Sequence, residues 1–168
     1  MDFLRPVQLP STVPGRLYLC SMPGRYQPLE TCFAALRNAS CSLLVCLAPR
    51  EEIRQKSPGY LHAIASETLP CEQHQFPIAD YQAPRDIAAF ARSVRRIADA
   101  LRSGNAVAIH CGAGIGRTGT FAIGVLVALG LSIDEASPLV SKAGSGPERE
   151  EQRESLRQLT STISSQTT

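Results

Sequence analysis

The sequence predicts an α/β fold in which a central, mostly parallel sheet is flanked by helices. Short apolar runs alternate with longer segments whose apolar residues recur at helical spacing, and this alternation is typical of such a sandwich. Two runs, Leu43–Leu47 and Ala106–Ile109, are apolar almost throughout, as expected for strands buried on both faces. The length of 168 residues suits one domain with a sizeable core. We therefore expect a single domain over residues 1–168.

The positions of prolines and glycines and the spacing of apolar residues predict the secondary-structure elements. Residues 1–15 contain several prolines and predict an extended lead-in. The expected strands, in order, are 17–20, 43–47, 71–78 and 106–109. The expected helices are 29–37, 60–67, 84–102, 121–131, 133–142 and 147–163. Residues 49–57 are polar and are interpreted as a connection, and residues 161–168 form a polar tail that we expect to fray.

The segment 84–102 is the clearest helix. Its apolar residues form one stripe, namely Ile87, Phe90, Val94, Ile97 and Leu101. Pro84 suits the first turn, Asp86 suits the positive end of the helix dipole, and Gly104 suits the C-terminal cap. The first and last helices are less regular, but each still carries apolar residues at helical spacing.

Composition and charge argue against several classes of function. The formal net charge of +2 does not suggest a nucleic-acid partner. No segment reaches the length of a membrane span, and the first residues lack the apolar core of a signal peptide, so we expect a cytoplasmic protein without membrane insertion. None of the six cysteines forms a Cys-x-x-Cys pair, and the three histidines are scattered. We therefore expect neither a metal site nor a cofactor.

One stretch, Val107–Gly119, combines a strand, a turn and a helix start. The apolar run delivers His110 and Cys111 into a glycine-rich turn, and Arg117 then opens a strongly apolar segment. A nucleophile at the end of a strand, a loop of free amides and a helix N-terminus together make a site for an anion.

Two nucleotide-binding interpretations of this turn fail. A Walker loop needs four residues between its glycines and then a lysine, whereas three residues separate Gly112 from Gly116 and the cation is Arg117. The stretch Gly114–Gly119 does match G-x-G-x-x-G, but the acid of that fingerprint should close a second strand about twenty residues later. Asp134 has nearly that spacing and follows a helical segment instead.

A Cys-x5-Arg-Thr loop preceded by His gives every residue a role. A thiol becomes a good nucleophile as the thiolate, which a helix N-terminus and converging amides favour. Arg117 offers a planar fork to two phosphate oxygens, and the Thr118 hydroxyl is placed to hydrogen-bond the Cys111 sulfur. His110 orients the loop, a structural role. The loop residues expected to contact phosphate are Gly112, Ala113, Gly114, Ile115 and Gly116.

This motif resembles that of the cysteine-dependent protein tyrosine phosphatase superfamily, and the size of the chain is similar to its small dual-specificity branch. The resemblance implies a phosphatase-like sandwich and a cysteinyl-phosphate intermediate. It also implies a general acid on a loop before the long helix. Asp80 fits that place, and Asp86, the rival, suits helix capping better.

Three further assignments follow from the resemblance and leave alternatives open. Gln152 stands where some relatives hold the hydrolytic water, although a solvated helix residue fits equally. Cys46 stands where some relatives form a disulfide with the nucleophile, here Cys111, although a buried inert thiol fits as well. Tyr81, next to the acid, is expected in the pocket wall. The oligomeric state is left open.

The expected substrate is a phosphorylated protein. Residues 112–116 contain no lysine or arginine, whereas relatives that act on phosphoinositides often carry basic residues there. Phosphotyrosine is therefore favoured, with phosphoserine and phosphothreonine left open. The alternatives are a phosphoinositide phosphatase, a catalytically silent phosphate-binding module, and a rhodanese-like sulfurtransferase, which also presents a cysteine in a loop of amides.

Overall fold

The computed structural model describes residues 2–166. Its strands are β1 (Arg5–Val7), β2 (Arg16–Cys20), β3 (Cys41–Cys46), β4 (Glu72–Gln75) and β5 (Ala106–His110). They form one sheet in the order β1-β2-β5-β3-β4. Strand β1 pairs with β2 antiparallel and all other pairs are parallel. The predicted mostly parallel sheet is thus confirmed.

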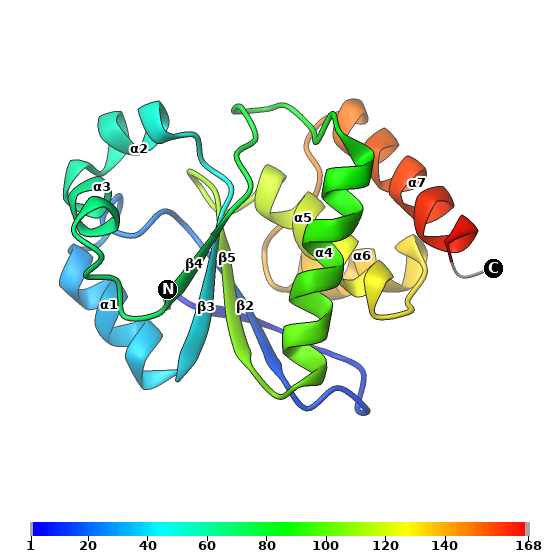
Figure 1. Ribbon diagram of the computed structural model, residues 1–168, viewed down its shortest axis with the longest axis horizontal. Helices are drawn as coiled ribbons and strands as arrows, with labels where there is room; N and C mark the ends of the chain where they lie inside the picture. Colours follow the sequence, from blue (N-terminus) through cyan, green and yellow to red (C-terminus); the bar gives the residue numbers. More distant parts are fainter. Residues whose placement is uncertain (1, 167–168) are drawn as a thin grey trace.

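Helices cover both faces of the sheet, as Figure 1 shows from its edge. One face carries α1 (Leu29–Asn38), α2 (Arg50–Lys56) and α3 (Pro58–Ala65). The other carries α4 (Ile87–Arg102), α5 (Gly116–Ala128), α6 (Ile133–Lys142) and α7 (Glu150–Ser165). Each face has its own apolar cluster. The fold is therefore the predicted three-layer sandwich.

The central strand β5 determines where the site lies. All five of its residues are buried, because β2 and β3 flank it in the sheet and helices cover both faces. In the parallel register, Cys20 of β2 and Cys46 of β3 both stand opposite His110. The carboxyl ends of the three strands therefore meet at one edge, where α/β sheets place their ligands.

Four segments differ from the sequence-based expectation. The lead-in contains β1, which is too short to show a pattern and is fixed by pairing with β2. The polar connection contains α2, which buries a single apolar residue, Ile53, and so has no stripe. Helix α5 begins at Gly116 rather than at residue 121, because tertiary packing overrides the low helix propensity of glycine. Helix α7 continues to Ser165, so much of the expected frayed tail is helical; residues 167–168 lie outside the described part.

Candidate active site

The loop that follows β5 surrounds a small pocket. Cys111 is the first residue after the strand and is only 2% exposed. The pocket has a volume of about 100 Å³ and lies over Cys111, Gly116 and Arg117. It is roofed by Asp80 and Tyr81, which come from the loop between β4 and α4. The structure therefore brings together two segments that the sequence separates widely.

The backbone of the loop is held from outside. Its carbonyls accept hydrogen bonds as follows: Cys111 O from His110 Nδ1, Gly112 O from Met22 N, Gly114 O from Arg5 Nη2 and Ser145 Oγ, and Ile115 O from Gly119 N and Gly146 N. In a trans peptide, the C=O and the next N–H point in opposite directions. Carbonyls tied outward therefore aim the amides of Gly112, Ala113, Ile115 and Gly116 into the loop, which is the arrangement that binds an anion. The Gly114 amide donates to the Cys111 sulfur at 3.3 Å.

His110 is hydrogen-bonded to the backbone of the loop, the kind of contact on which its predicted structural role rests. Its Nδ1 donates to the Cys111 carbonyl at 2.9 Å, and its Nε2 lies 2.8 Å from the Tyr60 hydroxyl, which in turn accepts from Gln73 Nε2. A carbonyl only accepts, so Nδ1 must carry the proton. Burial is the main reason that the pKa of His110 falls to about 4. The ring is therefore neutral at pH 7.

Arg117 is buried at the base of the pocket, with its side chain 3% exposed. It makes two hydrogen bonds of 2.8 Å to the carboxylate of Glu52, one of 2.8 Å to the Ile78 carbonyl and one of 3.0 Å to Asp80. Burial alone would lower the pKa of Arg117, but the hydrogen bonds and charge of Glu52 outweigh it and raise the pKa. The guanidinium is thus fixed and fully charged.

Glu52 lies at the first turn of α2, and the sequence pattern did not predict a role for it. Burial raises the pKa of its carboxyl, but hydrogen bonds from Arg117 and Lys56 outweigh burial and lower the pKa to about 2. Its side chain is 11% exposed. The only sequence feature that could have indicated Glu52 is the pair of adjacent acids after a buried strand, because α2 itself was not predicted.

Asp80 occupies the loop above the pocket, as expected for the acid. Its Oδ1 lies 3.0 Å from Arg117 Nη2 and accepts from the Tyr81 amide at 3.0 Å, and its Oδ2 lies 3.8 Å from Lys56 Nζ. Its side chain is 50% exposed. Asp86 instead accepts from the Ala89 amide and caps α4. The two acids therefore have separate surroundings.

Gln152 is fully buried, so the alternative of a solvated helix residue is wrong. Its Oε1 accepts from the amides of Glu148 and Arg149, and its Nε2 donates to the Gln82 carbonyl at 3.1 Å. Gln152 thus ties the start of α7 to the acid loop. It also lines the pocket over Cys111, which leaves the second hydrogen of its amide for a ligand.

The structure places the three other predicted residues, Thr118, Tyr81 and Cys46, in different surroundings. Thr118 Oγ1 is buried and, within residues 2–166, has no hydrogen-bond partner, so the expected bond to the Cys111 sulfur is not formed here. Tyr81 adopts φ +61° and stacks under Arg149, whose guanidinium lies 5.0 Å from the ring centroid. Cys46 is buried with a free thiol, and burial is the main cause of its raised pKa, about 11; its disulfide stays a prediction.

The rim of the pocket holds cations that the loop itself lacks. A Cβ atom built on Gly112 would lie 2.9 Å from Arg25 Nη1 and 3.1 Å from Lys56 Nζ. Both residues line the pocket over Cys111. The fold therefore supplies from the β2–α1 turn and from α2 the basic groups that are absent between residues 112 and 116.

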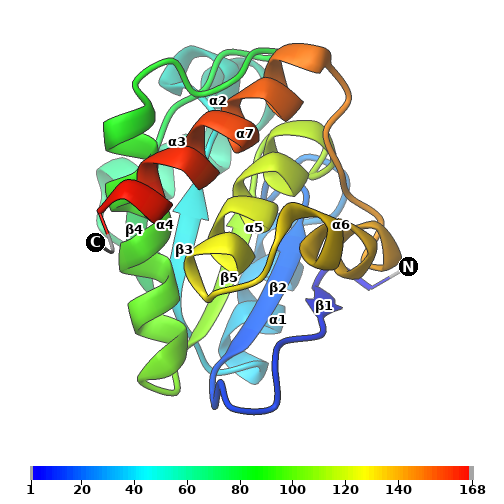
Figure 2. The same ribbon diagram turned by 90° about the vertical axis from the view of Figure 1, so that its right-hand side faces the viewer.

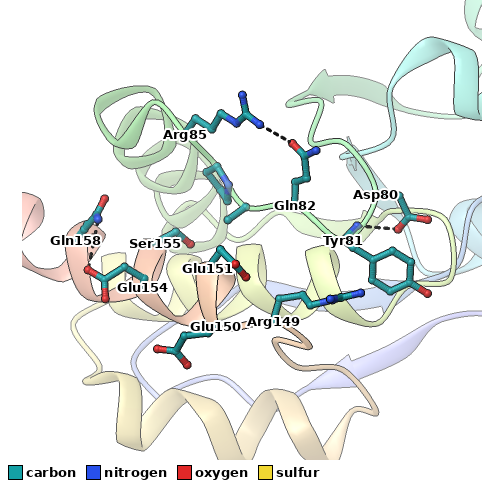
Figure 3. A pocket seen from close by; sticks show the side chains of 12 residues that line it. Asp80, Tyr81, Gln82, Arg85, Arg149, Glu150, Glu151, Glu154, Ser155 and Gln158 are labelled. Atoms are coloured by element: carbon teal, nitrogen blue, oxygen red, sulfur yellow. Dashed lines mark hydrogen bonds between the residues drawn. The ribbon is translucent and has the colours of Figure 1, made fainter.

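A larger hollow adjoins the pocket, between the acid loop and α7 (Figure 3). Its volume is about 930 Å³, and Asp80 and Tyr81 line both it and the phosphate-sized pocket. Figure 3 shows the Arg149 side chain beside the Tyr81 ring, at the end of the hollow where Asp80 lies. The small pocket and the hollow along α7 are thus adjacent.

Comparison with known proteins identifies the family. A family model described as "Polymorphic toxin system, DSP-PTPase phosphatase" (Tc-R-P) matches residues 20–131. The chain belongs to this family. The matched stretch contains the strand, the acid loop and the whole Cys-x5-Arg-Thr loop. A search of curated protein sequences found no match.

Solved structures of phosphatases share this fold. Tk-PTP in its active form is 26% identical, with a TM-score of 0.70 over 90% of this chain and 97% of that chain. A kinase associated phosphatase with its catalytic-site cysteine replaced by serine is 19% identical, with a TM-score of 0.80 over 96% and 95% of the two chains. PTPMT1 in complex with PI(5)P is 18% identical, with a TM-score of 0.75 over 99% and 100%. The chain is thus a phosphatase domain of the small dual-specificity type.

Within residues 2–166, no group of three His, Cys, Asp or Glu side chains is placed to hold a metal ion. In the same part of the chain, no helix has the length and apolar character needed to cross a membrane.

Proposed function

We propose that this phosphatase domain hydrolyses phosphotyrosine in proteins through a cysteinyl-phosphate intermediate. In the first step, the Cys111 sulfur bonds to phosphorus, the ester P–O bond breaks, and Asp80 gives its proton to the departing oxygen. In the second step, a water oxygen bonds to phosphorus, the S–P bond breaks, and the water proton passes to Asp80. Inorganic phosphate then leaves.

One observation carries this proposal: amides aimed inward and a fixed guanidinium surround the pocket over a buried cysteine. Preorganised donors stabilise the charge that develops on phosphoryl oxygens, because they need no reorganisation during the reaction. Arg117 is aligned by its two hydrogen bonds to the Glu52 carboxylate. The serine replacement in the related kinase associated phosphatase supports a cysteine nucleophile.

Gln152 and Thr118 are proposed for the second step. Gln152 lines the pocket and keeps one amide hydrogen unused by its three hydrogen bonds, so it is suited to orient the water. The unpartnered hydroxyl of Thr118 is available to donate to the thiolate as it departs. A buried hydroxyl without a partner costs about 1–3 kcal/mol, which such a bond would recover.

The hollow along α7 favours a polypeptide substrate. It continues from the phosphate pocket past Asp80 and Tyr81, and its volume of about 930 Å³ exceeds that of a lone phenyl phosphate. The exposed ring of Tyr81 lines both cavities. We propose that the phosphorylated residue enters the small pocket while flanking residues lie along α7. A reduced thiol suits a cytoplasmic site of action.

A phosphoinositide is the second candidate, because Arg25 and Lys56 stand at the pocket mouth. Further phosphates on an inositol ring would meet these cations. The similarity in fold to PTPMT1, solved with PI(5)P, agrees with this candidate. Lys56 is already paired with Glu52 at 2.8 Å, however, which leaves Arg25 as the main contact and favours the protein substrate.

The test compares substrates and variants of the pure protein. Para-nitrophenyl phosphate should be hydrolysed in the presence of a chelator and inhibited by vanadate, and Cys111→Ser should abolish turnover. Asp80→Ala should lower kcat by about 10²–10⁴-fold, whereas the matched Asp86→Ala should not. Faster turnover of a phosphoinositide than of a phosphotyrosine peptide would select the second candidate. Binding without turnover, or thiosulfate sulfurtransferase activity, would refute the proposal.

A further inference from the structure

Arg5 lies outside the stretch that defines the family and takes no part in the steps above, yet its side chain reaches the phosphate loop. Its Nη2 donates to the Gly114 carbonyl at 2.6 Å, and its Nη1 donates to the Ala143 carbonyl at 2.6 Å and to Ser145 Oγ at 3.1 Å. Ser145 Oγ also donates to the Gly114 carbonyl, at 2.6 Å. One loop carbonyl is thus held by two donors that also bond to each other.

The register of β1 explains how Arg5 reaches this point. Arg5 stands opposite Leu19 in the antiparallel pair, one residue from the end of β2. Gly114 passes over that end so closely that a Cβ atom there would lie 2.3 Å from the Cys20 carbonyl oxygen. Figure 2 shows β1 beside α6, whose C-terminal end supplies the other anchor. The guanidinium therefore bridges the loop and the α6–α7 connection.

The carbonyl that accepts from Arg5 belongs to the Gly114–Ile115 peptide. The plane of that peptide also carries the Ile115 amide, which points the opposite way, into the pocket. The amide of the same Gly114 donates to the Cys111 sulfur. Rotation of this residue would therefore remove one phosphate donor and disturb the contact to the nucleophile.

We propose that Arg5, together with Ser145, is a positioning residue that aims the Gly114–Ile115 peptide at the phosphoryl group. This role rests on the function proposed above. The surrounding segments enclose Arg5 closely enough that burial lowers the pKa of its guanidinium.

The decisive experiment measures oxyanion binding and turnover for Arg5→Met, Arg5→Lys and a matched control, Arg16→Met. Arg16 lies on β2 and is exposed. In Arg5→Met, orthovanadate affinity, measured by calorimetry, and kcat should each fall at least about tenfold. The KM for para-nitrophenyl phosphate should change less, because the amide matters most for the pentacoordinate state. Lysine offers a point charge without the planar fork and should restore part of the loss.

Several outcomes overturn the proposal. Unchanged vanadate affinity and kcat in folded Arg5→Met would leave Arg5 a purely structural residue, as would an equal loss in Arg16→Met. If Arg5→Met does not fold, Ser145→Ala replaces it and should weaken vanadate binding about threefold; an unchanged value refutes the role. Vanadate binding needs no turnover, so a wild type that binds vanadate but hydrolyses nothing would refute the proposed function and leave the role of Arg5 testable.

Discussion

Replacing Glu52 by glutamine should weaken the contacts that hold Arg117 in place and leave the rest of the fold unchanged. The change keeps the size of the side chain but removes the charge and one of the two acceptor oxygens that Arg117 and Lys56 share. Arg117 keeps its bonds to the Ile78 carbonyl and to Asp80. The variant therefore tests the two ion pairs of Glu52, with Arg117 and with Lys56, within an otherwise intact pocket.

The magnitude follows from the pKa of Glu52. A fall from 4.5 to about 2 on folding corresponds to about 3 kcal/mol of stability at pH 7, at about 1.4 kcal/mol per pH unit. Because the folded pKa is depressed, this stability is present above pH 4.5 and is lost as the pH falls toward 2. At pH 3.5, about 2 kcal/mol should remain. The side chain is only 11% exposed, so solvent screening reduces these values little.

Urea unfolding at pH 7 and pH 3.5 measures the effect. Glu52→Gln should be less stable than wild type by about 3 kcal/mol at pH 7 and by about 2 kcal/mol at pH 3.5. Glu51→Gln is the matched control, because Glu51 is its neighbour on α2, is 62% exposed and pairs only with Arg54 among the described residues. Its loss should stay below about 1 kcal/mol.

Turnover gives a second readout of the same variant. Arg117 can clamp phosphate only if it is held in place, and loss of one charge-assisted hydrogen bond of about 1.5–3 kcal/mol should lower kcat/KM about 10- to 100-fold. A Glu52→Gln variant with the stability and kcat/KM of Glu51→Gln would refute the argument. So would a loss of stability that is independent of pH.

Two other predictions concern the loop itself. Because the pKa of His110 falls to about 4 on folding, from 6.5, protonation favours the unfolded state, and stability should drop by about 2 kcal/mol between pH 7 and pH 5; urea unfolding of His110→Gln should lack this drop. In Gly119→Ala, the new Cβ would lie 2.2 Å from the Gly146 backbone nitrogen, so the melting temperature should fall by an amount equivalent to about 1–3 kcal/mol. Gly146→Ala, with nothing within 4 Å of its new Cβ, should melt like wild type.

The sequence was most informative where one local stretch carries both pattern and chemistry. Strand β5 and the loop after it could be predicted because the features that mark them are contiguous in the sequence. A buried apolar run leads directly into Cys111, and three glycines lie between Cys111 and Arg117. Asp80 could be placed by its position between a strand and a long helix. The stripe of α4 was visible because an amphipathic helix of sixteen residues repeats its pattern over several turns.

The supporting residues could not be predicted for the same physical reason. Glu52 sits on a helix of seven residues with one buried apolar side chain, which is too short to show periodicity. Arg5 acts from a strand of three residues, whose partner is set by register rather than by pattern. The burial of Gln152 goes with its bond to the carbonyl of Gln82, which is 70 positions away in the chain, and this contact requires the folded chain. Local patterns encode reactive groups, whereas their supports come from tertiary packing.

The two acids on Arg117 differ in a way that orders the events of binding. Glu52 is nearly buried and makes two hydrogen bonds to the guanidinium, whereas Asp80 is half exposed and makes one. An arriving phosphate dianion competes for the same donors, and exposed single contacts are the weaker ones. The phosphate should therefore displace Asp80 and leave Glu52 in place. We propose that Asp80, released from Arg117 and still 3.8 Å from Lys56 Nζ, is then free to turn toward the leaving oxygen, so that substrate binding and placement of the acid are coupled through one guanidinium.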